Sequence, residues 1–458
     1  MAPTQVARKL LGAWYTPPEL IDVVIDALMS GFSVHHARAI RVLDPACGDG
    51  RFLIAIAARL RDLGARVELT GCDIDFTALD QISDSSIRPV HADALTHEWG
   101  DEQFDIVIGN PPFLSQMAAG TTRGGASRHG GGPYMDAAAE FLALAVRLAV
   151  PDGGRIGLVL PQSILAARDC GPVREAVSRQ ADLVWSWWEP KQQHFDASVN
   201  VCVLVFHRPA HGSVSSSTWA GVITDRLGIP PIDGSMLSAR GTIGDLAELN
   251  ANFRDEYYAL VPAVSDDADG PPLVTSGLID PGVCLWGTRS ITFAKRSFAA
   301  PRVDVSKLAG RFPAWAARKL VPKVLVANQT RIIEAVADPL GAWLPGVPVN
   351  TVTPIDPNDV WAIAAVLTSP VASALAWQAG AGTGLSATSV RIGPAMLAAI
   401  PWPMGQLASA IEALRAGDLD ECGCATMVAY GLEDHDLIDW WLNHWPGSGR
   451  GSLRQEHR

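Results

Sequence analysis

The sequence predicts an α/β protein built on a mainly parallel, doubly wound sheet. A β-branched run at residues 104–108 ends in Gly109 and leads directly into an Asn-Pro-Pro-Phe tetrapeptide at 110–113. A short strand at 41–44 is followed by a glycine loop and a helix, and further apolar strands alternate with helical stretches. Such alternation favours a parallel sheet, which carries its functional groups at the carboxyl ends of its strands.

The composition is that of a globular chain in a reducing compartment. Its 458 residues leave room for two or three domains, and 48% hydrophobic with 18% charged residues is ordinary for a folded protein. No apolar run approaches the roughly 18 residues that cross a bilayer. Seven scattered cysteines indicate a reduced, cytoplasmic protein. The pair Cys422 and Cys424 is too closely spaced and too isolated for zinc, so we expect no metal. The lack of a long apolar run likewise leads us to expect no membrane partner.

The tetrapeptide after Gly109 carries the chemistry of the predicted sheet edge. Pro111 and Pro112 have no N–H, so the carbonyls around them are left to accept hydrogen bonds from a ligand. Asn110 adds a side-chain acceptor and Phe113 a flat ring. Two acceptors and a stacking face suit the exocyclic amine of a planar base. Asn-Pro is also a common turn pair, and these residues alone leave a simple strand-ending turn equally open.

Asn110-Pro111-Pro112-Phe113 resembles the Asn-Pro-Pro-aromatic catalytic motif of S-adenosylmethionine-dependent adenine-N6 DNA methyltransferases of the restriction–modification type. The resemblance implies a Rossmann-like class I methyltransferase sheet, with catalytic and substrate-binding roles for Asn110, Pro111 and Phe113. Phe113 stands where tyrosine is frequent in that family, which removes a hydroxyl and keeps the ring.

A glycine loop after the first strand resembles the S-adenosylmethionine loop of the same family. Asp44 ends the strand, and the loop continues through Ala46, Gly48 and Gly50 into a helix that begins at Arg51. A lone Gly-x-Gly is weak evidence, but an acid before it suits a cationic, amine-bearing ligand. By resemblance, Asp44, Ala46, Gly48 and Gly50 bind the cofactor.

Two further strands end in acids. Asp73 ends a strand at 67–73, where it is placed to accept hydrogen bonds from ribose hydroxyls. Asp93 follows a strand at 87–91, where the resemblance places it against the cofactor's adenine amine. Asn110 also belongs to the cofactor-binding residues that the family implies.

The segment before the first strand predicts a helix with a capping box. Thr16 as N-cap, Pro17 at the first helical position and Glu19 three residues after the cap form the pattern. Tyr15 and Thr16 resemble the family segment that lies against the methionine end of the cofactor. The same residues could also be no more than a favourable helix start, with no role in cofactor binding.

The rest of the sheet follows in order. We expect a helix that follows Tyr134-Met135-Asp136 and runs through Leu148, and strands over 155–160, 183–187 and 199–206. Phe195, between the last two strands, resembles the aromatic residue that these enzymes stack on a flipped base. A role as a core aromatic is equally open.

Composition divides the chain into three parts. Residues 1–207 form the expected methyltransferase domain, 208–404 a mixed α+β DNA target-recognition domain, and 405–458 a helical segment and tail with helices over 407–414 and 437–445. This arrangement resembles the gamma motif order. The net charge of −12 argues against indiscriminate polyanion binding. Residues 289–331, however, hold ten Lys and Arg residues and a single acid, Asp304. Such a basic block is an electrostatic feature of nucleic-acid-binding surfaces, but solvated helix faces also collect Lys and Arg, and this second interpretation is the more common one.

These features predict a site-specific enzyme that moves a methyl group from S-adenosylmethionine to N6 of a flipped adenine in double-stranded DNA. Restriction or defence-system subunits are possible partners. Two alternatives stay open. Methylation of a protein glutamine at N5 uses the same four motif residues, although it does not need a long region after the fold. The chain could also be a non-catalytic DNA-binding subunit of a restriction or defence complex.

Overall fold

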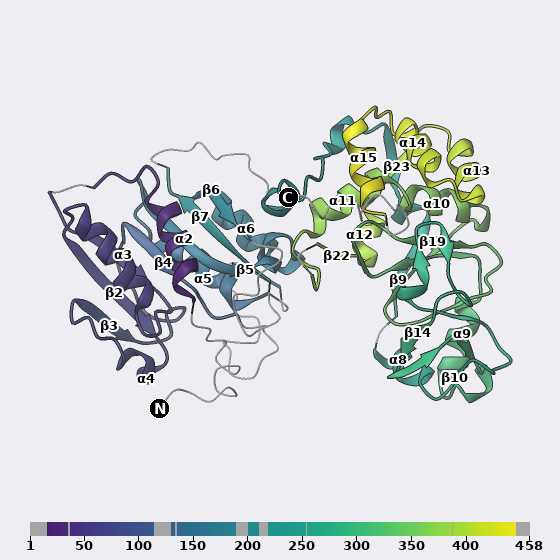
Figure 1. Ribbon diagram of the computed structural model, residues 1–458, viewed down its shortest axis with the longest axis horizontal. Helices are drawn as coiled ribbons and strands as arrows, with labels where there is room; N and C mark the ends of the chain where they lie inside the picture. The colour runs from purple at the N-terminus through teal and green to yellow at the C-terminus, as the bar shows by residue number, and fades with distance from the viewer. Residues whose placement is uncertain are drawn as a thin grey trace. The chain divides into compact units, whose positions relative to one another are not determined.

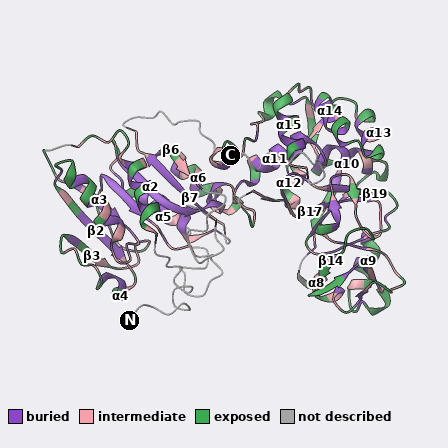
Figure 2. Cartoon of the chain, viewed as in Figure 1, coloured by how far each residue is buried: buried purple, intermediate pink, exposed green. Residues whose placement is uncertain are grey.

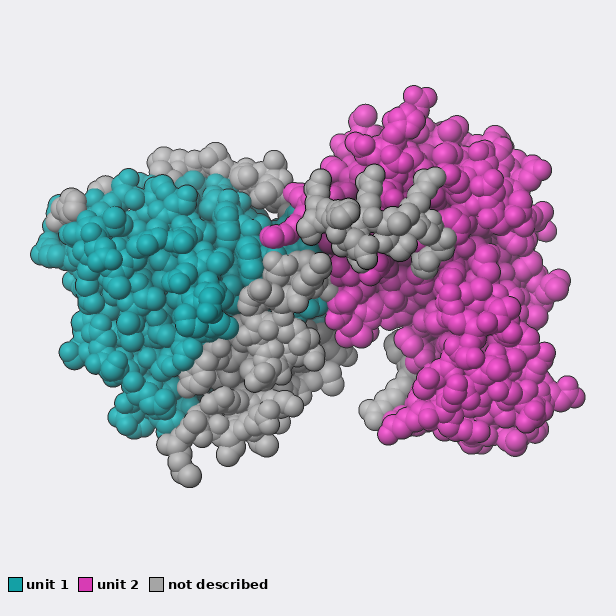
Figure 3. Space-filling view, in the orientation of Figure 1, with its two compact units in different colours: residues 1–223 teal, residues 224–458 magenta. Residues whose placement is uncertain are grey.

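The computed structural model describes residues 16–34, 37–113, 130–132, 135–188, 200–209, 219–252, 254–386 and 388–445. Two residues singled out above, Tyr15 and Phe195, lie outside these ranges. The chain divides into two compact units, residues 1–223 and 224–458 (Figure 3). The sequence places a boundary after residue 207 and a third part from 405, and the roles assigned to those parts stay predictions.

The first unit is built on a seven-stranded sheet in the order β3-β2-β1-β4-β5-β7-β6 (Figure 1). The strands from β3 to β5 lie parallel to their neighbours, whereas β7 runs antiparallel to both β5 and β6. Their bounds are β1 Ile40–Asp44, β2 Val67–Asp73, β3 Ile87–His91, β4 Ile106–Gly109, β5 Arg155–Pro161, β6 Asp182–Trp187 and β7 Val201–His207. The predicted Rossmann-like α/β sheet is confirmed.

Helices cover this sheet with apolar faces. Buried residues recur along α2 at helical spacing, as in Leu20, Val24 and Leu28, and they share one core cluster with buried residues of α3 and the sheet. Figure 2 shows the sheet interior as buried. The helices of this unit are α2 Pro18–Met29, α3 Arg51–Asp62, α4 Phe76–Leu79, α5 Ala137–Leu148, α6 Gly171–Ser178 and α7 Gly221–Thr224, the last of which reaches into the second unit.

The capping box expected at Thr16 is wrong. Helix α2 begins at Pro18, with Pro17 as its N-cap and no side-chain cap bond. Proline at the first position has no N–H to satisfy, so this helix start does not require a capping hydroxyl. The Thr16 hydroxyl instead accepts a hydrogen bond from Asn110, far away in sequence.

The second unit is mixed α+β, as expected. Its largest sheet has four antiparallel strands in the order β19-β17-β21-β9, and the other described strands of the unit form short two-stranded ribbons. The four strands are β9 Ala247–Ala251, β17 Lys323–Ala327, β19 Ala335–Asp338 and β21 Val349–Pro354. The ribbon strands are β8 Ala239–Thr242, β10 Val264–Ser265, β11 Leu273–Val274, β12 Ile279–Asp280, β13 Val283–Cys284, β14 Ile291–Phe293, β15 Arg296–Phe298, β16 Arg302–Val303, β18 Gln329–Thr330, β20 Leu344–Pro345, β22 Val390–Arg391 and β23 Pro401–Pro403.

Helices of the second unit gather mainly toward its C-terminal part. They are α8 Arg254–Leu260, α9 Phe312–Lys319, α10 Val360–Leu367, α11 Pro370–Gly380, α12 Pro394–Ala398, α13 Ala408–Ala416, α14 Leu419–Ala429 and α15 His435–Asn443. The helices expected over 407–414 and 437–445 correspond to α13 and α15. Helix α14, which was not predicted, carries Cys422 and Cys424. Within the described ranges no single helix has the length and apolarity to cross a membrane, although residues 357–367 and 370–380, bent by 70°, pass that test as a pair.

Candidate active site

The candidate site lies at the carboxyl edge of the first sheet. Strand β1 pairs with β2 on one side and with β4 on the other, with Val42 opposite Ile106 and Leu43 opposite Val107. Because these strands are parallel, Asp44, Asp73 and Asn110 emerge at the same edge. The expectation that these residues gather at one sheet edge therefore agrees with the strand register.

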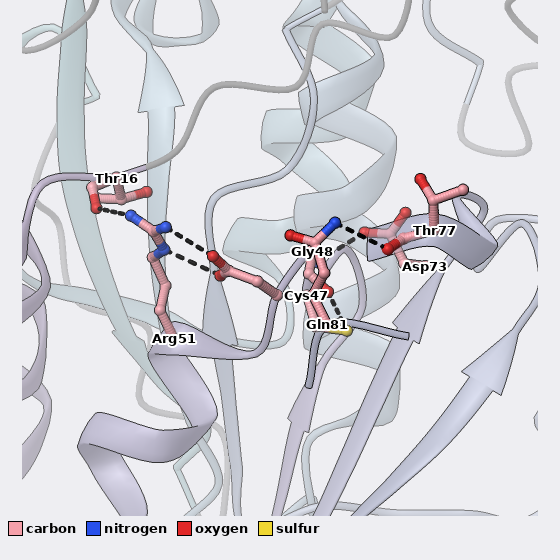
Figure 4. A network of polar contacts seen from close by, with 8 residues as sticks. Thr16, Cys47, Gly48, Arg51, Asp73, Thr77 and Gln81 are labelled. Atoms are coloured by element: carbon pink, nitrogen blue, oxygen red, sulfur yellow. Dashed lines mark hydrogen bonds and ion pairs between the residues drawn. The ribbon is translucent and has the colours of Figure 1, made fainter. Parts of the chain in front are cut away.

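The glycine loop is joined to the end of β2 (Figure 4). The Gly48 amide donates to Asp73 Oδ2 at 2.7 Å. The Cys47 amide also donates to the Cys72 carbonyl at 2.9 Å. Gly48 and Gly50 have φ values of 52° and 81°, which only glycine adopts without strain. Gly50 is also the N-cap of α3. The loop therefore needs glycines at both positions to turn from β1 into the helix.

Asp44 is a buried acid pressed against the strand that leads to Asn110. Only 1% of its surface is exposed, and its Oδ1 accepts from the Ala46 amide at 3.0 Å. A Cβ on Gly109 would come 2.4 Å from the same Oδ1, so the carboxyl occupies space that any other residue at 109 would need. Burial, helped by the charges of Asp73 and Asp49, raises the pKa of Asp44 to about 8.

Asp73 and Asp93 stand at the ends of the next two strands. Burial raises the pKa of the Asp73 carboxyl, while the amides of Asp75 and Gly48 oppose that shift. Asp93 Oδ1 accepts from the Leu95 amide at 3.0 Å. The assignment of these two acids to ribose and adenine stays a prediction.

The segment before α2 is held against both the glycine loop and the tetrapeptide. Asn110 Nδ2 donates to Thr16 Oγ1 at 3.0 Å, and Thr16 is 2% exposed. Arg51 Nη1 donates to the Thr16 carbonyl at 3.0 Å, and the same guanidinium forms a fork on the Asp49 carboxylate at 2.9 and 2.6 Å (Figure 4). Sequence reasoning missed Arg51. Its signal was an arginine in the first turn after the last glycine of the loop.

Two exposed apolar side chains lie beside Asp73. Ile74 is 60% and Phe76 62% exposed, and the Phe76 ring meets His91 edge-on with centroids 5.5 Å apart. Sequence reasoning did not assign them a role, although an apolar residue directly after a strand-ending acid was visible. They present an apolar surface beside the acid at the end of β2.

The tetrapeptide itself continues from β4. Pro111 is buried, Phe113 is half-buried, and the Phe113 side chain packs against the core cluster beneath the sheet edge. Pro111 and Phe113 are placed at the edge by the strand, and their catalytic and substrate-binding roles stay predictions.

The cysteines of this region do not provide a nucleophile. All seven cysteines are free. Burial raises the pKa of Cys47 far above neutrality and that of Cys72 to about 12, which keeps both as thiols near neutral pH. Across the ranges that the structure describes, no three His, Cys, Asp or Glu side chains are arranged to hold a metal ion.

A mixed, mainly parallel sheet with acids at the ends of β1 and β2 and a glycine loop between β1 and α3 defines the class I S-adenosylmethionine-dependent methyltransferase fold. Residues 2–219 match the model of the N-6 DNA methylase family, so this part of the chain is an N-6 DNA methylase domain. The family resemblance predicted from the motifs is confirmed there, and S-adenosylmethionine is the cofactor of this fold and family.

Comparison with individual proteins gives relatives of two kinds. The type II methyltransferase M.CvrRI of Paramecium bursaria Chlorella virus XZ-6E is 25% identical over 248 residues, which cover 53% of this chain and 60% of that protein. The release factor glutamine methyltransferase of Bordetella pertussis is 27% identical over 191 residues, covering 38% of this chain and 67% of that protein. The match therefore spans less than two thirds of the viral relative's length.

A solved structure also matches this chain beyond the first unit. The type IIL restriction-modification enzyme MmeI, solved in complex with DNA, matches with a TM-score of 0.57 at 13% identity, over 96% of this chain and 77% of that protein. At this identity the match shows a shared fold.

Proposed function

We propose that this protein is a site-specific DNA methyltransferase that moves a methyl group from S-adenosylmethionine to N6 of an adenine rotated out of the duplex. The observation that carries the proposal is the position of Asn110. Its amide follows a buried parallel strand, lies at the same sheet edge as the glycine loop, and is held by Thr16. The second unit supplies the additional region that a sequence-reading enzyme needs.

The residues at the sheet edge fit the cofactor. Asp44, Ala46, Gly48 and Gly50 would line its methionine end together with Thr16. Tyr15, which the family resemblance assigns to the cofactor, lies outside the described residues. The buried Asp44 carboxyl is neutral in much of the neutral pH range, and a sulfonium or ammonium group beside it would favour the carboxylate. Asp73 would take the ribose hydroxyls and Asp93 the adenine amine, with Ile74 and Phe76 offering apolar surface next to the ribose.

Asn110 and Pro111 would orient the target amine. Since Asn110 Nδ2 donates to Thr16, the acceptor role of this amide falls to Oδ1. That oxygen and the Pro111 carbonyl would accept the two N6 hydrogens, drawing the nitrogen lone pair out of conjugation with the ring. S-adenosylmethionine supplies the methyl group. The protein's contribution is then positioning and electrostatic stabilisation, without a covalent enzyme intermediate.

Aromatic stacking would stabilise the rotated base. Extrusion from the duplex costs a few kcal/mol. Stacking on Phe113, and on Phe195 as the sequence suggests, offsets about 1–3 kcal/mol per base. Phe113 packs against the core cluster, and this packing would restrict its ring for the base.

Protein glutamine N5-methylation is the second candidate, favoured by the relative from Bordetella pertussis that is named for that activity. It would use the same Asn110 and Pro111 acceptors. It gives no role to the second unit, residues 224–458, and we therefore rank it below DNA. A non-catalytic DNA-binding subunit would not need the contact between Asn110 and Thr16. Restriction or defence-system subunits are proposed as further partners, and the free cysteines support a cytoplasmic setting.

The test is expression in a host that lacks adenine methylation, beside an Asn110→Ala variant, with N6-methyladenine mapped across the genome. A short motif methylated by the intact protein and left unmodified by the variant would establish the enzyme and its target together. A protein that binds S-adenosylmethionine and leaves no adenine mark would overturn the stand-alone DNA activity. Incubation with labelled cofactor and cell protein would then test the glutamine alternative.

A further inference from the structure

A short β-ribbon in the second unit presents polar side chains on its outer side. Strands β18 and β22 pair antiparallel, with Gln329 opposite Arg391 and Thr330 opposite Val390. Thr330 and Val390 are buried, whereas Arg391 is exposed and Gln329 is half-buried. Because side chains alternate across a strand, Gln329 and Arg391 lie on the side away from the core. We call Gln329, Arg331, Ser389 and Arg391 the ribbon face, since Arg331 and Ser389 flank the pair at the next positions.

The backbone of this ribbon is firmly anchored. The Ile392 amide donates to the Asn328 carbonyl at 2.7 Å, and the side chains of Asn328 and Asn350 both donate to the Ile392 carbonyl at 3.0 Å. Trp377 Nε1 donates to the Arg331 carbonyl at 2.6 Å. These bonds fix the backbone of both strands from the buried side. Side chains on a rigid element can be aimed more accurately than those on a loop.

Hydrogen bonds also restrain the polar side chains of the ribbon face. Gln329 Nε2 donates to Ser389 Oγ at 3.4 Å, and Ser386 Oγ donates to the same atom at 2.9 Å. Because Gln329 Nε2 points toward Ser389, the amide oxygen Oε1 points away from Ser389. The face therefore combines a restrained amide with two cationic side chains.

The basic block at 289–331 does not form one cationic surface. Six of its ten members make contacts within the unit itself. Three form ion pairs on its surface, namely Arg289 with Asp280, Lys307 with Asp304 and Arg311 with Asp255. Arg302 donates to the Gly270 carbonyl and lies over the Trp286 ring, while the buried Lys319 bonds Asn250 and the buried Lys323 pairs with Asp338. Arg331 and Arg391 form no ion pair with any acid in the described part of the chain, which is also true of Lys295, Arg296 and Arg318, but Arg331 and Arg391 lie beside the restrained amide of Gln329. One lies at the end of the block and the other far outside it in sequence.

We infer that the ribbon face is a double-stranded DNA contact of the second unit. The inference rests on the proposed function and names where the target duplex is held. The charges are complementary to phosphate, and a two-stranded ribbon fits the major groove. Arginine pairs with the guanine edge or with phosphates, and the glutamine amide pairs with the adenine edge. The face brings both kinds of residue together on one anchored element.

The experiment measures binding of a fluorescent duplex that contains the methylated motif, at several salt concentrations, in the full-length protein. Arg331→Ala and Arg391→Ala should each weaken binding about tenfold and lower the salt slope by about one. The matched control is Lys295→Ala, which removes an exposed cation at the turn between β14 and β15. The affinity for S-adenosylmethionine should stay at the wild-type value in all three variants. This measurement serves as a control that the first unit is folded.

Gln329→Ala tests whether the face reads sequence. Methylation by this variant should spread to sites that differ from the motif at one position, whereas a phosphate contact would leave the motif unchanged. Wild-type DNA binding by both arginine variants would overturn the inference and leave the methyltransferase proposal standing. An equal loss in Lys295→Ala would also overturn it, because diffuse charge would then explain the effect. A wild-type protein that neither binds nor methylates DNA would overturn the inference and the proposed function together.

Discussion

Asn110 Nδ2 donates a hydrogen bond to Thr16 Oγ1 at 3.0 Å, across 94 positions of sequence. Thr16 also receives the Arg51 guanidinium on its carbonyl oxygen. One buried residue therefore connects the amide after β4 with the first turn after the glycine loop. This connection fixes which arm of the Asn110 amide can accept the hydrogens of a target amine. It makes Thr16 a positioning residue in the proposed reaction.

We expect Thr16→Val to lower kcat about fivefold, because the amide loses a partner worth about 1 kcal/mol and no longer holds one orientation. The KM for S-adenosylmethionine should change less than kcat. Thr16→Ser retains the hydroxyl and should restore most of the rate. Steady-state kinetics with methylatable duplex DNA measure both constants. A rise in KM with unchanged kcat would instead assign Thr16 to cofactor binding alone.

Gly109→Ala should abolish cofactor binding and lower the melting temperature. The new Cβ would fall 2.4 Å from a carboxyl oxygen of Asp44, which is buried, so the carboxyl would have to shift inside the core. Overpacking of this kind costs about 1–3 kcal/mol. Gly171→Ala is the control, because its Cβ meets only the end of the Arg174 side chain at 3.9 Å. Thermal melting and calorimetric titration should separate the two variants, and equal melting temperatures would contradict the steric argument.

Cofactor affinity should rise with pH up to about pH 8 and then level. Burial raises the Asp44 pKa to about 8, so the carboxyl is mostly protonated below that value. A bound cation favours the carboxylate, and binding must then release a proton, which weakens affinity by up to about tenfold for each pH unit below 8. Titration calorimetry in buffers of different ionisation enthalpy measures the released proton.

Asp44→Asn provides the control for this pH dependence. The amide does not titrate, so the rise in cofactor affinity between neutral pH and pH 8 should be lost in this variant. An unchanged slope would show that Asp44 is not the titrating group.

Phe113→Ala should lower kcat/KM for DNA by about 10- to 100-fold, because stacking of a base on an aromatic ring is worth about 1–3 kcal/mol. Phe113→Tyr keeps the ring and should remain close to wild type. The comparison matters because Phe113 also packs against the core. If the alanine variant melts at the wild-type temperature and keeps the full rate, the stacking role is wrong.

The sequence by itself determined the sheet and the order of its functional stations. Strand β-branching, the glycines at 48 and 50, and acids at 44, 73 and 93 are local signals, and the strands they predict match the observed bounds to within a few residues. The position of the Asn-Pro-Pro-Phe motif directly after β4 was likewise predicted from the sequence. These features are readable because each depends on a few neighbouring residues and on the period of a strand or helix.

Tertiary structure decided what those residues contact. The sequence predicted Thr16 as a helix cap, yet its hydroxyl accepts a hydrogen bond from Asn110. The helix begins at Pro18, which has no N–H, so its start does not require a capping hydroxyl. The basic block looked like a surface, yet several of its cations are buried or paired within the unit. Burial raised the pKa of Asp44, which no spacing reveals. Pairing, burial and desolvation depend on residues that are distant in sequence, so they are fixed only when the chain has folded.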